Sequence, residues 1–135
     1  MPVSDCAIIP LETRSDDRGL LSFVEGGMHI PFEIARIYYL HGLTDGTERG
    51  AHAHRELRQL MIAISGSFTV TLDDGCSKAD YALDSPTKGL LICPMIWRTL
   101  HHFTPGAVCV VLASHHFDEA DYFRRYDDFI KAARQ

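Results

Sequence analysis

Two histidines stand two positions apart in the stretch R-G-A-H-A-H that runs from Arg49 to His54. On an extended backbone, side chains at positions i and i+2 point to the same side. His52 and His54 would then enter one cavity, about 7 Å apart by the rise of a strand. An imidazole has an unperturbed pKa near 6.5 and is also the commonest metal ligand in its neutral form. The pair therefore predicts a site for proton transfer or for metal binding.

The residues around this pair resemble the first motif of the cupin barrels, in which a glutamate and then a glycine follow His-x-His at fixed intervals. Gln59 stands where the glutamate would be, and Gly66 follows it after the expected six residues. A carboxamide is a poor substitute for a carboxylate on a hard or borderline cation. In the segment that would supply a further histidine, Arg98 and Thr99 occupy that place. We therefore expect a site without a metal ion.

The length and composition of the chain are typical of a single globular domain. The chain has 135 residues, enough for one domain that spans 1–135, and 46% of them are hydrophobic. Its formal net charge of -5 does not favour nucleic-acid binding, so an anionic ligand must be held by local arginines. No apolar run approaches the ~18 residues of a membrane span, and the first residues do not resemble a secretory signal, which predicts a cytoplasmic protein without membrane contact. The four cysteines form no C-x-x-C pair and are predicted to be reduced, structural thiols.

Most of the chain has the pattern of short strands separated by turns. Besides the histidine stretch, we predict strands at 7–11, 20–25, 35–40, 60–63, 68–72, 79–83, 89–93 and 107–113. Only the tail changes period, because acidic residues from Asp118 to Asp121 precede aromatic residues at helical spacing. The sequence therefore predicts an all-β sandwich or barrel with a short C-terminal α-helix, whose aromatic stripe packs on the barrel.

A more specific resemblance extends over nearly the whole chain. The motifs are R-I-Y-Y at 36–39, R-G-A-H-A-H at 49–54, L-D-D-G at 72–75, L-D-S-P at 83–86, Pro94 with Trp97, V-L-A-S at 111–114, and D-E-A-D-Y at 118–122 with Tyr126-Asp127. In this order they resemble the sugar nucleotide 3,4-ketoisomerases, which are metal-free cupins acting on dTDP-4-keto-6-deoxyglucose. One position departs from the family, because Arg98 stands where the relatives have a histidine after the tryptophan.

The resemblance implies a cupin (a double-stranded β-helix or jelly-roll barrel) and a dTDP-linked 4-keto-6-deoxyhexose as substrate. It also implies a place in the synthesis of 3-amino-3,6-dideoxyhexoses for surface polysaccharide. Moving a ketone from C4 to C3 requires removal of the acidic C3 proton, an enediol intermediate and protonation at C4, with no redox cofactor. Such a reaction needs an acid and a base near neutral pKa within hydrogen-bond reach. The two histidines meet that need.

The resemblance and the residue chemistry together assign roles. We expect His54 to be the base that moves the proton between C3 and C4, with His52 as its partner, although the two roles can be exchanged. Tyr39 would donate to the enolate oxygen. The remaining candidates are substrate-binding: Arg18 and Arg49 for the pyrophosphate, Trp97 for stacking, Gln59 for hydrogen bonding inside the barrel, and Arg98 at the position of the departure.

Two other functions fit the same motif. One is a 3,5-epimerase on the same scaffold, with a histidine base and a tyrosine acid. The other is a non-catalytic or metal-binding cupin that serves as a sugar-binding module. Cupins of this kind are usually dimers, and exposed barrel edges favour pairing, so we also expect a homodimer.

Overall fold

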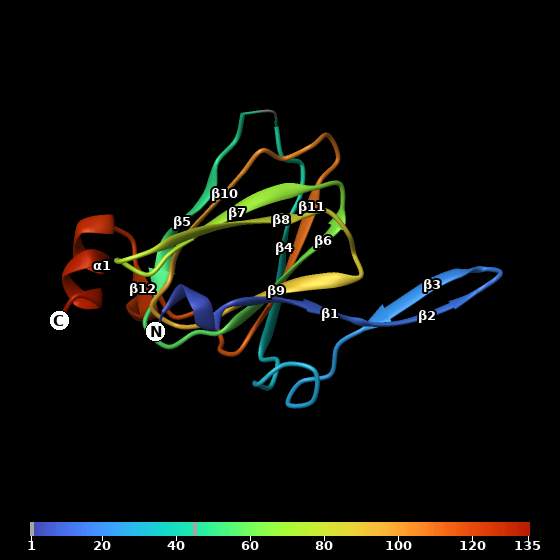
Figure 1. Cartoon of the computed structure of the whole chain (residues 1–135), viewed down its shortest axis with the longest axis horizontal. Coiled ribbons are helices and arrows are strands. Elements are labelled where there is room, and N and C mark those ends of the chain that lie inside the picture. Colours follow the sequence, from blue (N-terminus) through green and yellow to red (C-terminus); the bar gives the residue numbers. More distant parts are fainter. Residues whose placement is uncertain (1, 45) are drawn as a thin grey trace.

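Two antiparallel five-stranded sheets make up most of the molecule (Figure 1). The computed structural model describes residues 2–44 and 46–135 of the chain. The first sheet has the order β1 (Ala7–Pro10), β9 (Lys88–Ile92), β6 (Gln59–Ser65), β11 (Val108–Ala113) and β4 (Arg36–Leu40). The second has the order β12 (Tyr122–Phe123), β5 (Arg49–His54), β10 (Trp97–His101), β7 (Phe68–Asp73) and β8 (Lys78–Leu83). The predicted all-β architecture is confirmed.

The main core lies between the two sheets. On β7, the side chains of Phe68, Val70 and Leu72 are buried there, while the two intervening threonines are only half-buried. They pack with the inward side chains of the opposite sheet, such as Met61 and Val111. The alternation in the sequence thus sets which face of β7 is inside.

The first sheet is also covered on its outer face. Ile30 and Phe32, in the segment between β3 and β4, pack over Leu60, Ile62 and Leu112. Strand β6 is therefore buried on both faces over most of its length. This explains its continuous run of apolar residues, which alternation alone would not produce.

The N-terminal part begins with a turn of 3-10 helix, η1 (Val3–Asp5), followed by β1 at the edge of the first sheet. Pro10 is tolerated there because an edge strand leaves one row of backbone groups unpaired. A two-stranded hairpin, β2 (Glu12–Asp16) with β3 (Gly19–Phe23), then extends away from the sheets (Figure 1). Among the residues that the structure describes, no helix is long and apolar enough to cross a membrane.

The tail differs from its prediction. The expected helix from Asp118 is wrong, since α1 covers only Tyr126–Ala133. Asp118 does act as a cap, but of a single 3-10 turn, η2 (Glu119–Asp121), through a bond from the Ala120 N–H. The next two residues pair with β5 as strand β12, which ends the helical path. Two strands were not predicted: β10 and the first strand of the hairpin. In β10, one of the inward positions is occupied by a buried arginine, so the apolar alternation typical of a strand is interrupted.

Candidate functional site

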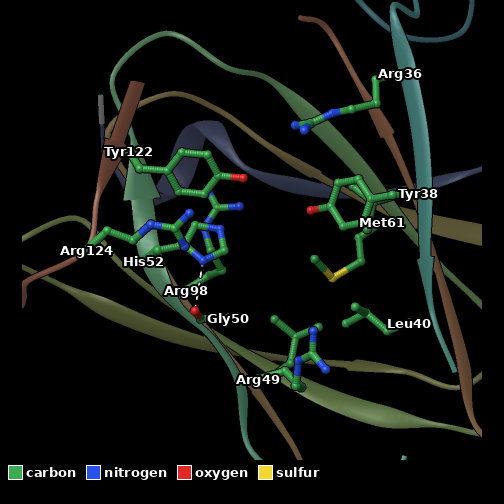
Figure 2. Close-up of a pocket in the computed structure, with 12 residues that line it drawn as sticks. Arg36, Tyr38, Leu40, Arg49, Gly50, His52, Met61, Arg98, Tyr122 and Arg124 are labelled. Carbon is green, nitrogen blue, oxygen red and sulfur yellow. Dashed lines mark hydrogen bonds between the residues drawn. The ribbon is translucent and has the colours of Figure 1, made fainter. Parts of the chain in front are cut away.

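A cavity of about 290 Å³ opens between the inner faces of the two sheets (Figure 2). Its described lining includes four arginines and no carboxylate: Arg36, Arg49, Arg98 and Arg124. Two tyrosines, Tyr38 and Tyr122, and the imidazole of His52 also face it. Although the whole chain is acidic, this concave surface carries positive charge, which suits an anionic ligand.

Strand β4 presents one tyrosine to the cavity and the other to solvent. Its register places Arg36, Tyr38 and Leu40 on the inner face, because successive side chains alternate. Tyr39 points outward and is 60% exposed. Tyr39, expected from the sequence to belong to the site, therefore does not line this cavity, whereas its neighbour Tyr38 does.

The orientation of His52 depends on Gly50. Strand β5 bulges at this point, where the pairing with β10 shifts between Arg98–His52 and Thr99–Gly50. Gly50 has φ of 89°, and a side chain there would approach the Arg98 carbonyl oxygen to 3.1 Å. The Gly50 carbonyl lies 2.8 Å from His52 Nδ1 and can only accept a hydrogen bond, so Nδ1 carries the proton. The neutral ring thus keeps a free lone pair on Nε2.

His54 is held in the same way by a carboxylate. Its Nδ1 lies 3.1 Å from Asp121 Oδ2, so the ring donates from Nδ1. Asp121 in turn accepts bonds from the backbone N–H groups of Glu56 and Leu57, which fix the carboxylate. Among the described residues, no group hydrogen-bonds the buried Nε2 of His52 or of His54.

The two imidazoles lie close together but do not line the same space. Their centroids are 4.9 Å apart with the rings perpendicular. His52 lines the main cavity, whereas His54 lies deeper and borders a separate cavity of about 50 Å³ next to Asp121. The two rings lie close together, as their spacing predicts. However, only His52 lines the main cavity, and the two do not share it.

Burial keeps both histidines neutral. Loss of solvation, followed by the charge of Arg98, lowers the pKa of His52 to about 4. The same two causes lower the pKa of His54 further below its usual value. Both rings are therefore neutral near pH 7, with the proton on Nδ1 and a lone pair on Nε2 that can accept a second one.

Arg98, Gln59 and Tyr38 form a directed chain of hydrogen bonds. Arg98 is 1% exposed, and burial lowers its pKa without removing its charge. Its Nη1 donates to Gln59 Oε1, while Nε and Nη2 donate to the Ile96 carbonyl at 3.3 and 3.1 Å. The amide of Gln59 must then turn its NH₂ toward Tyr38, and Nε2 donates to the Tyr38 hydroxyl at 2.8 Å. The tyrosine proton is left to point elsewhere, into the cavity.

Tyr122 closes the cavity over the histidines. Its ring lies 4.2 Å from the centroid of His54 and 5.1 Å from that of His52. Strand β12 places it there by pairing Tyr122 with His54. The guanidinium of Arg124 stacks on the Tyr122 ring, 3.8 Å from its centroid, and pairs with Glu119 through two hydrogen bonds of 2.8 Å.

The remaining predicted residues divide into two groups. Arg49, Gln59 and Arg98 are at the cavity or directly behind its wall, as described above. Arg18 lies at the turn of the β2–β3 hairpin, with 86% of its side chain exposed, and pairs with Asp16 at 2.7 Å. Trp97 shares a strand with Arg98 but faces outward, where it packs on Tyr126 and Phe129 of α1. The expected sites for Arg18 and Trp97 are thus not in this cavity.

Sequence reasoning missed several lining residues: Arg36, Tyr38, Tyr122, Arg124 and, behind the wall, Asp121. Arg36 and Tyr38 are two positions apart on one strand, so their side chains point to the same side. Placing either one in the cavity would have predicted the other. Tyr122 and Asp121 were hidden because their segment was interpreted as the start of a helix. In the described part of the chain, no three side chains of His, Cys, Asp or Glu gather in a metal-binding arrangement.

Comparisons with known proteins show which family the chain belongs to. The family model described as "FdtA: WxcM-like, C-terminal" matches residues 4–134. A TDP-4-oxo-6-deoxy-alpha-D-glucose-3,4-oxoisomerase from Aneurinibacillus thermoaerophilus is 43% identical over 124 residues, which cover 92% of this chain and 89% of the relative.

Solved structures give the same result. A mutant of the 3,4-ketoisomerase QdtA from Thermoanaerobacterium thermosaccharolyticum, in complex with TDP-4-keto-6-deoxyglucose, is 36% identical and has a TM-score of 0.95 over 98% of this chain and 96% of that chain. The WlaRB TDP-quinovose 3,4-ketoisomerase from Campylobacter jejuni is 40% identical, with a TM-score of 0.91 over 96% and 99%. The sugar epimerase NovW from Streptomyces spheroides, at 17% identity and a TM-score of 0.75 over 90% and 69%, is alike in fold alone.

Proposed function

Because this chain belongs to the family described as FdtA: WxcM-like, C-terminal, we propose that its arginine-lined cavity binds a TDP-linked 4-keto-6-deoxyhexose and moves the ketone from C4 to C3. The enzyme is an isomerase with a cupin-like fold, as are its ketoisomerase relatives. The observation on which the proposal rests most is that His52 lines a cavity that two tyrosine side chains also line, and that its Nε2 has no hydrogen-bond partner among the described residues.

Arginines supply the binding of the substrate's anionic part. A guanidinium offers a planar fork that matches phosphate oxygens. Arg49 and Arg124 lie at the more exposed wall, while Arg98 is buried, so the first two are suited to the diphosphate and Arg98 to the sugar end. The QdtA complexes with TDP and with TDP-4-keto-6-deoxyglucose support this class of ligand.

His52 is the base in this proposal. It takes the C3 proton, which is acidic because C3 lies next to the C4 carbonyl, and the electron pair moves to give an enediolate with negative charge on O4. The C3 hydroxyl proton passes to O4, and the same imidazolium then returns its proton to C4. The ketone is then at C3 and a hydroxyl is at C4. The roles of the two histidines are exchanged relative to the sequence-based expectation, because His52 and not His54 lines the main cavity.

The proposal also explains how a histidine with a low pKa becomes an effective base. Arg98 and burial depress the pKa of His52 in the free enzyme. An anionic substrate brings negative charge beside both groups, which favours the protonated imidazole and raises its pKa toward the working pH. The base therefore gains strength only when the substrate is in place.

Tyr38 and Tyr122 stabilise the oxygen on which charge develops. The Tyr38 proton is directed into the cavity by Gln59, and burial raises its pKa, so the hydroxyl remains a donor. A fixed donor in a site shielded from water lowers the energy of an enediolate without reorganisation during the reaction. His54 acts as a positioning residue, since it contacts His52 and Tyr122 and is itself fixed by Asp121.

Exposed apolar side chains support a homodimer. Leu20 and Leu21 on the β2–β3 hairpin are 69% and 60% exposed, and Ile37 and Tyr39 lie exposed on edge strand β4. Apolar side chains on an unpaired edge favour contact with a second copy. Light scattering coupled to gel filtration tests the stoichiometry, with twice the 15.2 kDa chain mass expected.

The activity is tested by incubation with dTDP-4-keto-6-deoxyglucose and NMR of the product. We expect a dTDP-3-keto-6-deoxyhexose. Stoichiometric recovery of the unchanged substrate from a folded enzyme that binds TDP would indicate a sugar-binding module instead.

A further inference from the structure

Two buried thiols face each other at the end of the β1–β9 ladder. The Sγ atoms of Cys6 and Cys93 are 3.2 Å apart, and the backbone N–H of Cys93 also points at Cys6 Sγ, at 3.4 Å. All four cysteines are free thiols, and of the other two, Cys109 is buried within β11 and Cys76 is exposed. The chemistry of the ketoisomerase uses none of them.

The topology brings these two residues together from opposite parts of the chain. Cys6 directly precedes β1 and Cys93 directly follows β9, and the two strands are antiparallel neighbours with Ala7 opposite Leu91. The side chains therefore meet at the end of the ladder, 87 positions apart in sequence. Their approach follows from the pairing of two strands and not from a flexible loop.

We propose that Cys6 and Cys93 form a site of reversible oxidation, at which hydrogen peroxide converts the two thiols into an intramolecular disulfide. In the first step, the Cys6 thiolate attacks one peroxide oxygen, the O–O bond breaks, and a sulfenic acid and hydroxide are formed. In the second, the Cys93 sulfur attacks the Cys6 sulfur and displaces the hydroxyl group as water. Two thiols are oxidised by two electrons and one peroxide is reduced to two water molecules.

The surroundings of the two thiols differ, which assigns the attacking role to one and the resolving role to the other. The hydrogen bond from Cys93, assisted by the charge of Arg98, lowers the pKa of Cys6 to about 7, while the same contact and burial raise the pKa of Cys93. Cys6 is thus the nucleophile toward peroxide and Cys93 the resolving thiol. Cys6 precedes an edge strand that pairs with only one neighbour, so local opening gives a small oxidant access.

The crosslink would act on the loop that supports the site. Cys93 begins the connection from β9 to β10, in which the Met95 N–H donates to the His54 carbonyl at 2.8 Å. Further along, the Ile96 carbonyl accepts from the Arg98 guanidinium. A disulfide would fix this loop to β1 and close a long segment of chain, which stabilises the fold by restricting the unfolded state.

The test uses the full chain with Cys76→Ser, which removes the exposed thiol and prevents crosslinks between molecules. Treatment with hydrogen peroxide and peptide mapping without reductant should give one Cys6–Cys93 linked peptide and a loss of about 2 Da, reversed by dithiothreitol. The oxidised protein should melt roughly 5–15 °C above the reduced one. In Cys93→Ser on the same background, the linked peptide should be absent and Cys6 should be trapped by a sulfenic-acid reagent.

Two results would overturn the proposal. One is peroxide-treated Cys76→Ser protein that retains both thiols, as measured by alkylation under denaturing conditions. The other is oxidation of Cys6 to a sulfinic acid with no linked peptide. Since these measurements do not use the isomerase reaction, they are independent of the proposed function.

Discussion

The side-chain amide of Gln59 donates to the Tyr38 hydroxyl over 2.8 Å, while its carbonyl end accepts from the buried Arg98. Because an arginine can only donate, this arrangement fixes the amide orientation. It leaves the Tyr38 proton directed at the cavity. A glutamine in the place of a cupin's glutamate thus has a positive role in aiming a donor.

Replacement of Gln59 by glutamate should reverse this direction. A carboxylate cannot donate to Tyr38, so the hydroxyl would donate to residue 59 and its proton would no longer face the substrate. We expect Gln59→Glu to lower kcat by about 10–100-fold with little change in KM, as for loss of one donor in the transition state. Steady-state kinetics with circular dichroism as a folding check would measure this. A kcat equal to that of the parent enzyme would show that the amide does not direct Tyr38.

The two adjacent tyrosines of β4 form a matched pair of variants. Tyr38→Phe should lower kcat by about 10²-fold, since it removes the donor to the enediolate oxygen. Tyr39→Phe alters a hydroxyl on the opposite face of the strand and should retain kcat within about twofold. Equal losses in the two variants, measured under identical conditions, would contradict the assignment from strand parity.

Asp121 should act through His54 and not on the substrate. In Asp121→Asn, the amide can donate to His54 Nδ1, so the ring can take the other tautomer, with the proton on Nε2. We expect kcat to fall about 10-fold or more with KM nearly unchanged. NMR of the ¹⁵N-labelled histidine rings would report the tautomer directly, with Nδ1–H in the parent and Nε2–H in the variant. A change in kcat with no change in tautomer would argue against this route.

The depressed pKa of His52 predicts a pH dependence. In the free enzyme the acidic limb of kcat/KM should follow a pKa near 4 and not the ordinary 6.5. As pH falls through 6.5, the unfolded chain takes up protons on His52 and His54 that the folded chain does not, so stability falls toward acid. Histidine NMR titration in the folded protein would separate these effects. A His52 ring that titrates near 6.5 would contradict the proposed burial effect.

Much of this architecture was accessible from the sequence. Period-two alternation located β7, and the histidine spacing placed both rings on one side of β5. Strand parity could not choose between Tyr38 and Tyr39, because both faces of β4 carry aromatic and aliphatic side chains. Tyr122 was missed because its segment has acids followed by aromatics, as a helix start would, and only pairing with β5 makes it a strand. Long-range pairing of this kind leaves no local signal.

Arg98 illustrates a second limit. On a strand, an arginine beside a tryptophan would ordinarily face water, yet Arg98 is buried and Trp97 packs on α1. The identity of a residue does not reveal which hydrogen bonds will compensate for burying its charge. Here the Ile96 carbonyl and Gln59 satisfy the guanidinium, and these contacts appear only in the folded chain.

The central claim is that His52 transfers a proton between C3 and C4 of a TDP-4-keto sugar, and isomerisation in D₂O tests it most directly. Proton and mass analysis of the product should confine hydrogen exchange to C4, where the hydrogen taken from C3 is replaced by deuterium only as far as the His52 imidazolium exchanges with solvent. The rate should fall about 10²–10⁴-fold in His52→Asn. Deuterium at C3 and C5 of an unmoved ketone would indicate an epimerase, and full activity in folded His52→Asn would show that His52 is not the base.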